Sequence, residues 1–308
     1  MKRFSPRDTP TQNLAWIGIS VALVTAFALL STFVPVSSFF VVLFLPVLTA
    51  LTAYYLKPSY LILYFFAGTI VVTAATCYQL TSTLFFILPT FFSGILFGFC
   101  LRKNLPSVWL IFATSCLSLA LNALSIPLLR AIYGIDVIDV VIALLPWEKE
   151  ETLRNLLPAF LMVEGLIENG ISFFLILGIM GRWEEKEEKD GMISTWFGMI
   201  FAIGCAALSF GVAFVSPLWA YLIAIWAIYF AITGIRTLFS RNPWWVYLTL
   251  GVLILLSFYL SAYFYSALPK AIAPLLFLSF FASLSLSEVV SVLSLKHQER
   301  KPQSWKRH

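Results

Sequence analysis

The chain consists largely of apolar runs long enough to cross a lipid bilayer. A helix needs about 20 apolar residues to span the hydrocarbon core. Ten runs meet this requirement, at residues 14–35, 38–56, 60–77, 83–101, 107–129, 156–181, 192–214, 217–236, 244–264 and 271–295. Charged residues make up only 11% of the chain, against roughly 25% in a soluble domain. We therefore expect an all-α, polytopic transmembrane helical bundle of about ten helices.

The distribution of Lys and Arg predicts how these helices alternate. If the N-terminus lies in the cytoplasm, 16 of the 20 Lys and Arg residues fall in cytoplasmic segments. Arg130, Lys149, Arg154 and Lys270 are the four that fall outside. Cytoplasmic loops of membrane proteins carry such an excess. The pattern indicates an even number of helices with both termini in the cytoplasm.

Two connections differ from the short loops elsewhere. The stretch 182–191 is a run of charges between the sixth and seventh helices. It predicts a six-helix membrane domain (1–181), a charged cytoplasmic linker (182–191), a four-helix membrane extension (192–295) and a basic cytoplasmic tail (296–308). The external segment 130–155 contains an apolar stretch, 137–145, that is too short to span the bilayer. We expect this stretch to be interfacial or re-entrant.

The chain carries no signature of an enzyme. Both histidines, His297 and His308, lie near the C-terminus, so no intramembrane histidine can serve as a base or metal ligand. No H-E-x-x-H, G-x-S-x-G or P-loop motif occurs, so the chain cannot hydrolyse ATP by that route. We expect no cofactor and no metal. The net charge of +5 comes from residues at the ends of apolar runs, and therefore does not indicate nucleic-acid binding.

Polar residues at membrane depth are the candidate functional residues. Glu164 and Glu168 lie four residues apart and share one face of a helix, and Asn169 follows directly. Asn122 lies within the fifth helix. A carboxylate in hydrocarbon costs about 2.5–3.5 kcal/mol, so these side chains should face the bundle interior or a wet cavity. They could form a ligand, cation or proton site, or a hydrogen-bond network that fixes helix packing. Glu288 lies near a cytoplasmic end, and we expect it to extend towards the headgroups.

Small residues at four-residue spacing occur in two helices. Gly18, Ala22 and Ala26 form such a ladder in the first helix, and Gly94 and Gly98 form a G-x-x-x-G motif in the fourth. Ladders of this kind allow two helices to approach closely.

These features resemble a known family. The ladder on the first helix and the run from Leu88 to Lys103, with its proline, G-x-x-x-G and basic end, are similar to the S components of energy-coupling-factor transporters. The size of the chain is closer to the YybS-like membrane proteins. The resemblance covers about residues 14–181 and implies a six-helix ligand-binding domain. It also implies that the first helix packs against a membrane coupling subunit, and that a small-molecule ligand binds from the outside near Asn122, Glu164, Glu168 and Asn169.

Three hypotheses follow for a multi-pass protein of the cell membrane, which we expect to be the bacterial plasma membrane. The first is a solute-binding or transport subunit without its own ATPase, with a coupling subunit or another membrane protein as partner. The second is a non-transporting scaffold or assembly factor of the cell envelope. The third is a proton-coupled carrier that uses Glu164 or Glu168.

Overall fold

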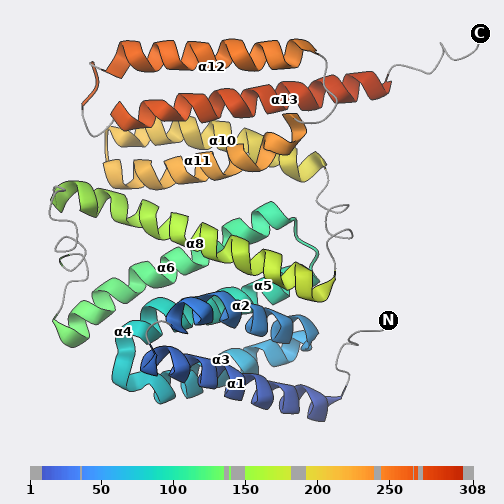
Figure 1. Ribbon diagram of the computed structural model, residues 1–308, viewed down its shortest axis with the longest axis vertical. Helices are drawn as coiled ribbons and strands as arrows, with labels where there is room; N and C mark the ends of the chain where they lie inside the picture. Colours follow the sequence, from blue (N-terminus) through green and yellow to red (C-terminus); the bar gives the residue numbers. More distant parts are fainter. Residues whose placement is uncertain are drawn as a thin grey trace, which may run out of the picture. The chain divides into compact units, whose positions relative to one another are not determined.

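The computed structural model describes residues 9–34, 37–134, 139, 150–181, 192–238, 244–265, 267–269 and 273–300 (Figure 1). The chain forms two compact units. Unit 1 comprises residues 1–147 and 160–189, and unit 2 comprises residues 148–159 and 190–308. The charged stretch 182–191 lies outside the described residues. So does the apolar stretch 137–145, apart from Asp139, and so does the chain beyond Arg300.

The described secondary structure is helical throughout. In chain order, the α-helices that begin before residue 182 are α1 (Pro10–Phe33), α2 (Ser37–Tyr55), α3 (Pro58–Thr76), α4 (Leu80–Ser82), α5 (Leu88–Arg102), α6 (Ser107–Tyr133) and α8 (Glu150–Met180). A 3-10 turn, η1 (Cys77–Gln79), and a π-helix, η2 (Thr83–Ile87), flank α4. The later elements are α10 (Met192–Ala213), α11 (Pro217–Leu238), α12 (Trp244–Tyr265), η3 (Ala273–Phe277) and α13 (Leu278–Arg300).

Helix length and composition confirm an all-α membrane bundle. Eight helical stretches of the described residues are long and apolar enough to cross a bilayer, and Phe40–Tyr55 adds a shorter apolar helix. Each of the ten predicted runs falls on a helix. This is a multi-pass integral membrane protein.

The prediction of two fully separate runs at 60–77 and 83–101 needs correction. The stretch Pro58–Arg102 is helical over 45 residues without a loop. At 1.5 Å per residue it would measure about 68 Å, more than twice the thickness of a bilayer core. The chain turns at η1, where Gln79 leaves helical geometry (φ −133°, ψ 60°). A helical turn therefore replaces the loop expected between these two spans.

Local sequence explains where several helices begin and end. The Thr9 hydroxyl accepts a hydrogen bond from the Gln12 amide (3.3 Å), and Pro10 occupies the first position of α1. Such a cap provides an acceptor for a backbone amide that has no partner within the helix. Proline suits the first position because it has no backbone N–H that would need a partner there. Pro58 and Pro217 likewise open α3 and α11. Gly134 ends α6 in the left-handed region (φ 68°), where a side chain would be strained.

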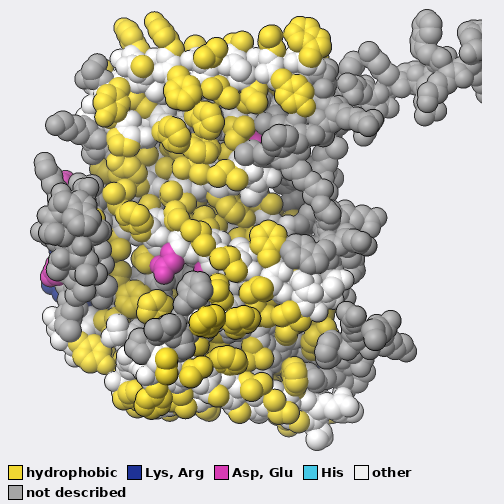
Figure 2. Space-filling model, viewed as in Figure 1, with side chains coloured by type: hydrophobic (Ala, Val, Ile, Leu, Met, Phe, Trp, Pro, Cys, Tyr) yellow, Lys and Arg dark blue, Asp and Glu magenta, His cyan; other side chains and the backbone are white. Residues whose placement is uncertain are grey.

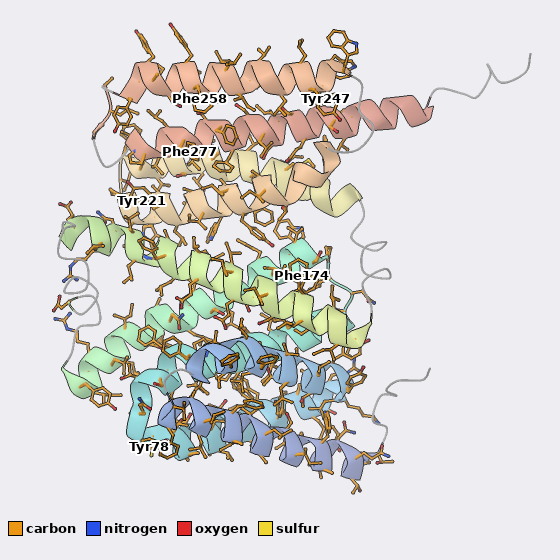
Figure 3. All side chains as sticks on the ribbon, in the orientation of Figure 1. Tyr78, Phe174, Tyr221, Tyr247, Phe258 and Phe277 are labelled. Carbon is orange, nitrogen blue, oxygen red and sulfur yellow. The ribbon has the colours of Figure 1, made fainter. Side chains whose placement is uncertain are left out.

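Contacts at the two ends of unit 1 fix the direction of its first helices. At one end, the Asn13 side chain accepts a hydrogen bond from the Lys57 amide (3.1 Å), and Arg102 donates to the Leu56 carbonyl. At the other end, Tyr78 is hydrogen-bonded to Thr32 and lies beside the end of α1 (Figure 3). The start of α1, the α2–α3 connection and the end of α5 therefore meet at one end. This is the alternation that the Lys and Arg pattern predicts, while the side that faces the cytoplasm stays a prediction.

Glycines allow α5 to lie directly against α2. A Cβ at Gly94 would overlap the Thr49 hydroxyl and come within 2.6 Å of the Pro46 carbonyl oxygen. A Cβ at Gly98 would overlap the Ala50 carbonyl oxygen. The G-x-x-x-G motif therefore serves packing within unit 1, between two helices of the same chain.

Unit 2 is organised around α13. This helix packs against α10, α11 and α12, and α10 and α11 form a hairpin against each other (Figure 1). The Phe280 ring lies 5.8 Å from that of Phe277 in η3 and 6.3 Å from that of Phe258 in α12. Phe258 and Phe277 extend from neighbouring elements (Figure 3). Aromatic side chains thus hold η3 and α12 against α13.

Gly98→Ala is expected to destabilise the protein because the new Cβ has no room against α2. Forced overpacking costs about 1–3 kcal/mol. The measurement is thermal unfolding of the detergent-purified protein. Gly18→Ala is the matched control, because a Cβ at Gly18 meets nothing within 4 Å. The control should be neutral, or stabilised by up to about 1 kcal/mol through helix propensity. Equal effects of the two substitutions would contradict the close packing of α2 and α5.

Candidate functional site

A stripe of buried polar residues runs along one face of α6. Ser115, Ser118, Asn122 and Ser125 recur every three or four residues, which places them on the same side of the helix. All four are buried. Buried hydroxyls and amides require hydrogen-bond partners. Ser115 and Ser125 find one each within α6, at the Ile111 and Leu121 carbonyls, and further partners come from neighbouring elements.

The stripe meets α8 where the two helices cross (Figure 1). The Ser115 hydroxyl donates to the Gly165 carbonyl oxygen (2.9 Å). The Asn169 amide nitrogen donates to the same carbonyl (2.7 Å), and it lies 3.3 Å from the Ser118 hydroxyl. A Cβ at Gly165 would make an ordinary van der Waals contact with Ser115, 3.4 Å from its carbonyl oxygen, so the two helices lie in contact here without requiring a glycine. The crossing is therefore joined by a compact polar cluster.

Three buried oxygen atoms in this region receive no hydrogen bond from any described residue. They are Oδ1 of Asn122, Oε1 of Glu168 and Oδ1 of Asn169. All three are acceptors, whereas the nearby Ser115 and Ser125 hydroxyls already donate to backbone carbonyls. Acceptors without donors are costly to bury. The region therefore has spare capacity for a group that brings hydrogen-bond donors or positive charge.

The two acids of α8 lie at the edge of this cluster. Glu164 is exposed, Glu168 is partly buried, and Asn169 beside it is fully buried. Glu164 sits near the middle of the apolar span Leu153–Met180. Figure 2 shows a small acidic patch surrounded mostly by hydrophobic side chains. At membrane depth, an exposed acid is expensive unless something polar covers it.

The structure brings some of the predicted residues together and leaves one apart. Glu164 and Glu168 lie on consecutive turns of α8, and Asn169, directly after Glu168, reaches α6. No hydrogen bond among the described residues joins Asn122 to α8. Asn122 lies one turn beyond Ser118, between the α8 crossing and Ser125, whose hydroxyl donates to the Leu84 carbonyl of η2 (3.0 Å).

Sequence reasoning missed Ser115, Ser118 and Ser125. Their spacing with Asn122 was visible in the sequence and could have identified the polar face of α6. Another prediction was wrong: Glu288 does not extend towards the headgroups, because its side chain is completely buried in unit 2. The described residues contain no group of three or more His, Cys, Asp or Glu side chains placed to hold a metal ion.

The ladder on α1 lies outside this site. Gly18, Ala22 and Ala26 are all exposed, whereas Ile17, Val21 and Val24 of the same helix are buried in the core of unit 1. The small residues therefore face away from the helices that pack on α1.

Comparisons with protein families, with curated proteins and with solved structures find no match. Function must therefore be inferred from the chemistry of these residues.

Asn169→Ala is expected to weaken the junction of α6 and α8. Interhelical hydrogen bonds in membrane proteins contribute about 0.6 kcal/mol on average and up to about 1.7 kcal/mol. A double-mutant cycle with Ser118→Ala, read from unfolding free energies in detergent, should give a coupling energy in this range. The control is Thr69→Ala, which removes an exposed hydroxyl bonded only within its own helix. Zero coupling between Ser118 and Asn169 would show that the cluster does not hold the helices together.

Proposed function

We propose that this integral membrane protein is a solute-binding or transport subunit without its own ATPase, and that its ligand binds at the α6–α8 crossing. The observation that carries the proposal is a pair of buried acceptor oxygens that no described residue donates to, on Glu168 and Asn169 of α8, with a third on Asn122, one turn beyond Ser118 along α6. A site used only for packing would be expected to satisfy its own polar atoms, as most buried polar groups in proteins do.

The chemistry of the site favours a ligand rich in donors or carrying positive charge. Carboxylate and amide oxygens accept hydrogen bonds and attract cations. Glu164 and Glu168 bring two acidic groups to one edge, and among the described residues Glu168 Oε1 has no donor of its own. A small amine or another cationic compound would supply both the donors and the charge. Following the family resemblance, we infer that it enters from the outside.

The exposed ladder on α1 supports a partner-dependent subunit. Small residues make tight interfaces between membrane helices, yet Gly18, Ala22 and Ala26 make no such interface within unit 1. A subunit of an ATP-driven transporter that lacks its own ATPase needs another protein to supply energy. In the family that the chain resembles, this face of the first helix packs against the coupling subunit.

Two alternatives use the same residues differently. In a membrane scaffold, the Ser115–Gly165–Asn169 cluster would only fix the crossing of α6 and α8, and no solute would bind. In a proton-coupled carrier, Glu164 or Glu168 would exchange protons during transport. The hydrogen bonds of the cluster are compatible with the scaffold, and the donor-free oxygens favour ligand binding.

The central test is thermal stability of the purified protein against a panel of polyamines, amino acids, vitamins and metal ions. A ligand at about 100 times its dissociation constant should add roughly 2.7 kcal/mol of stability. The shift should occur in the wild type and be lost in Glu164→Gln/Glu168→Gln. Glu151→Gln, which alters an exposed acid at the start of α8, is the matched control and should keep the shift.

Each result of this panel separates the hypotheses. A shift that survives in the Glu164→Gln/Glu168→Gln variant, together with unchanged uptake of the ligand by cells, would place the ligand elsewhere. No shift with any compound would favour the scaffold. If the variant still binds the ligand but cells that express it no longer take the ligand up, the proton-coupled carrier would be favoured.

Ala22→Leu should separate partner packing from ligand binding. The larger side chain would project from the exposed face of α1, so the stability of the purified protein and its ligand-induced shift should not change. Uptake of the ligand by cells that express the variant should fall because the coupling subunit can no longer approach closely. Unchanged uptake would contradict a role for the ladder in coupling.

A further inference from the structure

Unit 2 contains a buried carboxyl group that no described residue stabilises. Glu288 of α13 has no exposed surface, and neither of its carboxylate oxygens has a hydrogen-bond partner among the described residues. Ser285, one turn earlier on the same face, is also fully buried, and within the same part of the chain its hydroxyl has no partner. Two adjacent polar groups in the core of a membrane bundle are thus left without the contacts that such groups require.

Gly234 of α11 makes room for this carboxyl group. A Cβ placed on Gly234 would overlap the Glu288 carboxylate, because it would lie 2.6 Å from the carboxylate carbon and 3.0 Å from Oε1. The glycine is the reason why the acid can lie flat against the backbone of a neighbouring helix. The fit is close, so little space remains on this side for an ion with its own shell of ligands.

The helices around Glu288 offer little countercharge. Within the bounds of α10, α11 and α12, the sequence contains one charged residue, Arg236. Its position lies about 200° around α11 from Gly234 at 3.6 residues per turn, and its side chain is outside the described residues. The other titratable residues of these helices are Cys205, Tyr221, Tyr229, Tyr247, Tyr259, Tyr263 and Tyr265.

A buried carboxylate must be neutralised by a cation, by hydrogen bonds or by a proton. Metal ions such as Ca²⁺ and Mg²⁺ take six or more oxygen ligands. On this face of α13, side-chain oxygens come only from Glu288 and from Ser285 and Ser291, one turn to either side. The geometry suits a proton, which needs no coordination shell.

We propose that Glu288, beside Ser285 and against Gly234, is a proton-binding site of unit 2. It is separate from the solute site proposed for α6 and α8 and does not depend on it. Proton occupancy and helix packing are linked here, because an ionised carboxylate could not stay against the Gly234 backbone without a donor. Release of the proton would therefore require α11 and α13 to separate locally or the Glu288 side chain to leave its position.

Infrared spectroscopy of the full-length protein in lipid vesicles tests the site directly. The spectrum of the wild type minus that of Glu288→Gln at neutral pH should contain the carbonyl band of a protonated carboxylic acid, which shifts in D₂O. The spectrum of the wild type minus that of Glu151→Gln should not contain this band. Glu288→Gln is nearly isosteric with the protonated acid and should keep the fold, as judged by its unfolding temperature.

Three results would overturn the proposal. Loss of a carboxylate band, rather than a carboxylic acid band, in Glu288→Gln would show that Glu288 is ionised. Appearance of the acid band only after Arg236→Gln would show that Arg236 neutralises the carboxylate. Loss of the acid band on adding Na⁺ at constant pH and ionic strength would reassign the site to a metal cation.

Gly234→Ala provides an independent readout. The new methyl group should displace the carboxyl group and shift or broaden its infrared band, even if the unfolding temperature changes little. An unaltered band in a folded Gly234→Ala protein would contradict the contact between α11 and the acid.

Discussion

The structure depends on one constraint: within a bilayer, every polar group must find its partner inside the protein. Backbone groups meet this constraint through helices, which is why all the described secondary structure is helical. Side chains meet it in two ways, because lipid offers no hydrogen bonds: serine and threonine hydroxyls bond to carbonyls of their own helix, and other contacts form where helices cross. The Ser115, Gly165 and Asn169 contacts are one such crossing, and the Asn13, Leu56, Lys57 and Arg102 contacts tie three helix ends together in the same way.

Glycine determines how closely these crossings can form. Gly94 and Gly98 bring the α5 backbone against α2, and Gly234 accommodates the carboxyl group of Glu288. Gly18 has no neighbour at all within 4 Å of its missing side chain. The same residue type therefore serves two purposes in one chain: close helix packing and space for a buried acid.

Much of the fold could be predicted from sequence because hydrophobic length and charge bias are local properties. The ten apolar runs fall on helices, and contacts at both ends of unit 1 reproduce the predicted alternation. What the sequence could not supply was pairing between distant segments. The G-x-x-x-G motif at Gly94 and Gly98 does not indicate that α2 is the helix it packs against. The helical turn at η1 takes the place of an expected loop, and there the Thr83 hydroxyl is hydrogen-bonded to that of Thr76 (2.8 Å). The serine stripe of α6 was visible in sequence, but only the crossing with α8 shows what it contacts.

The glutamates show why the candidate sites needed a structure. Glu164, Glu168 and Glu288 all lie in apolar helices. Sequence alone left the pair on α8 open between a functional site and a packing network, and it treated Glu288 as a residue near the membrane surface. Their environments differ because of residues far away in the chain: α6 supplies Ser115 and Ser118 beside Asn169, whereas Gly234 lies against Glu288. Glu168 therefore belongs to an acceptor-rich cluster with an exposed acid at its edge, which suits a ligand with donors. Glu288 is enclosed on every side, which suits an occupant as small as a proton.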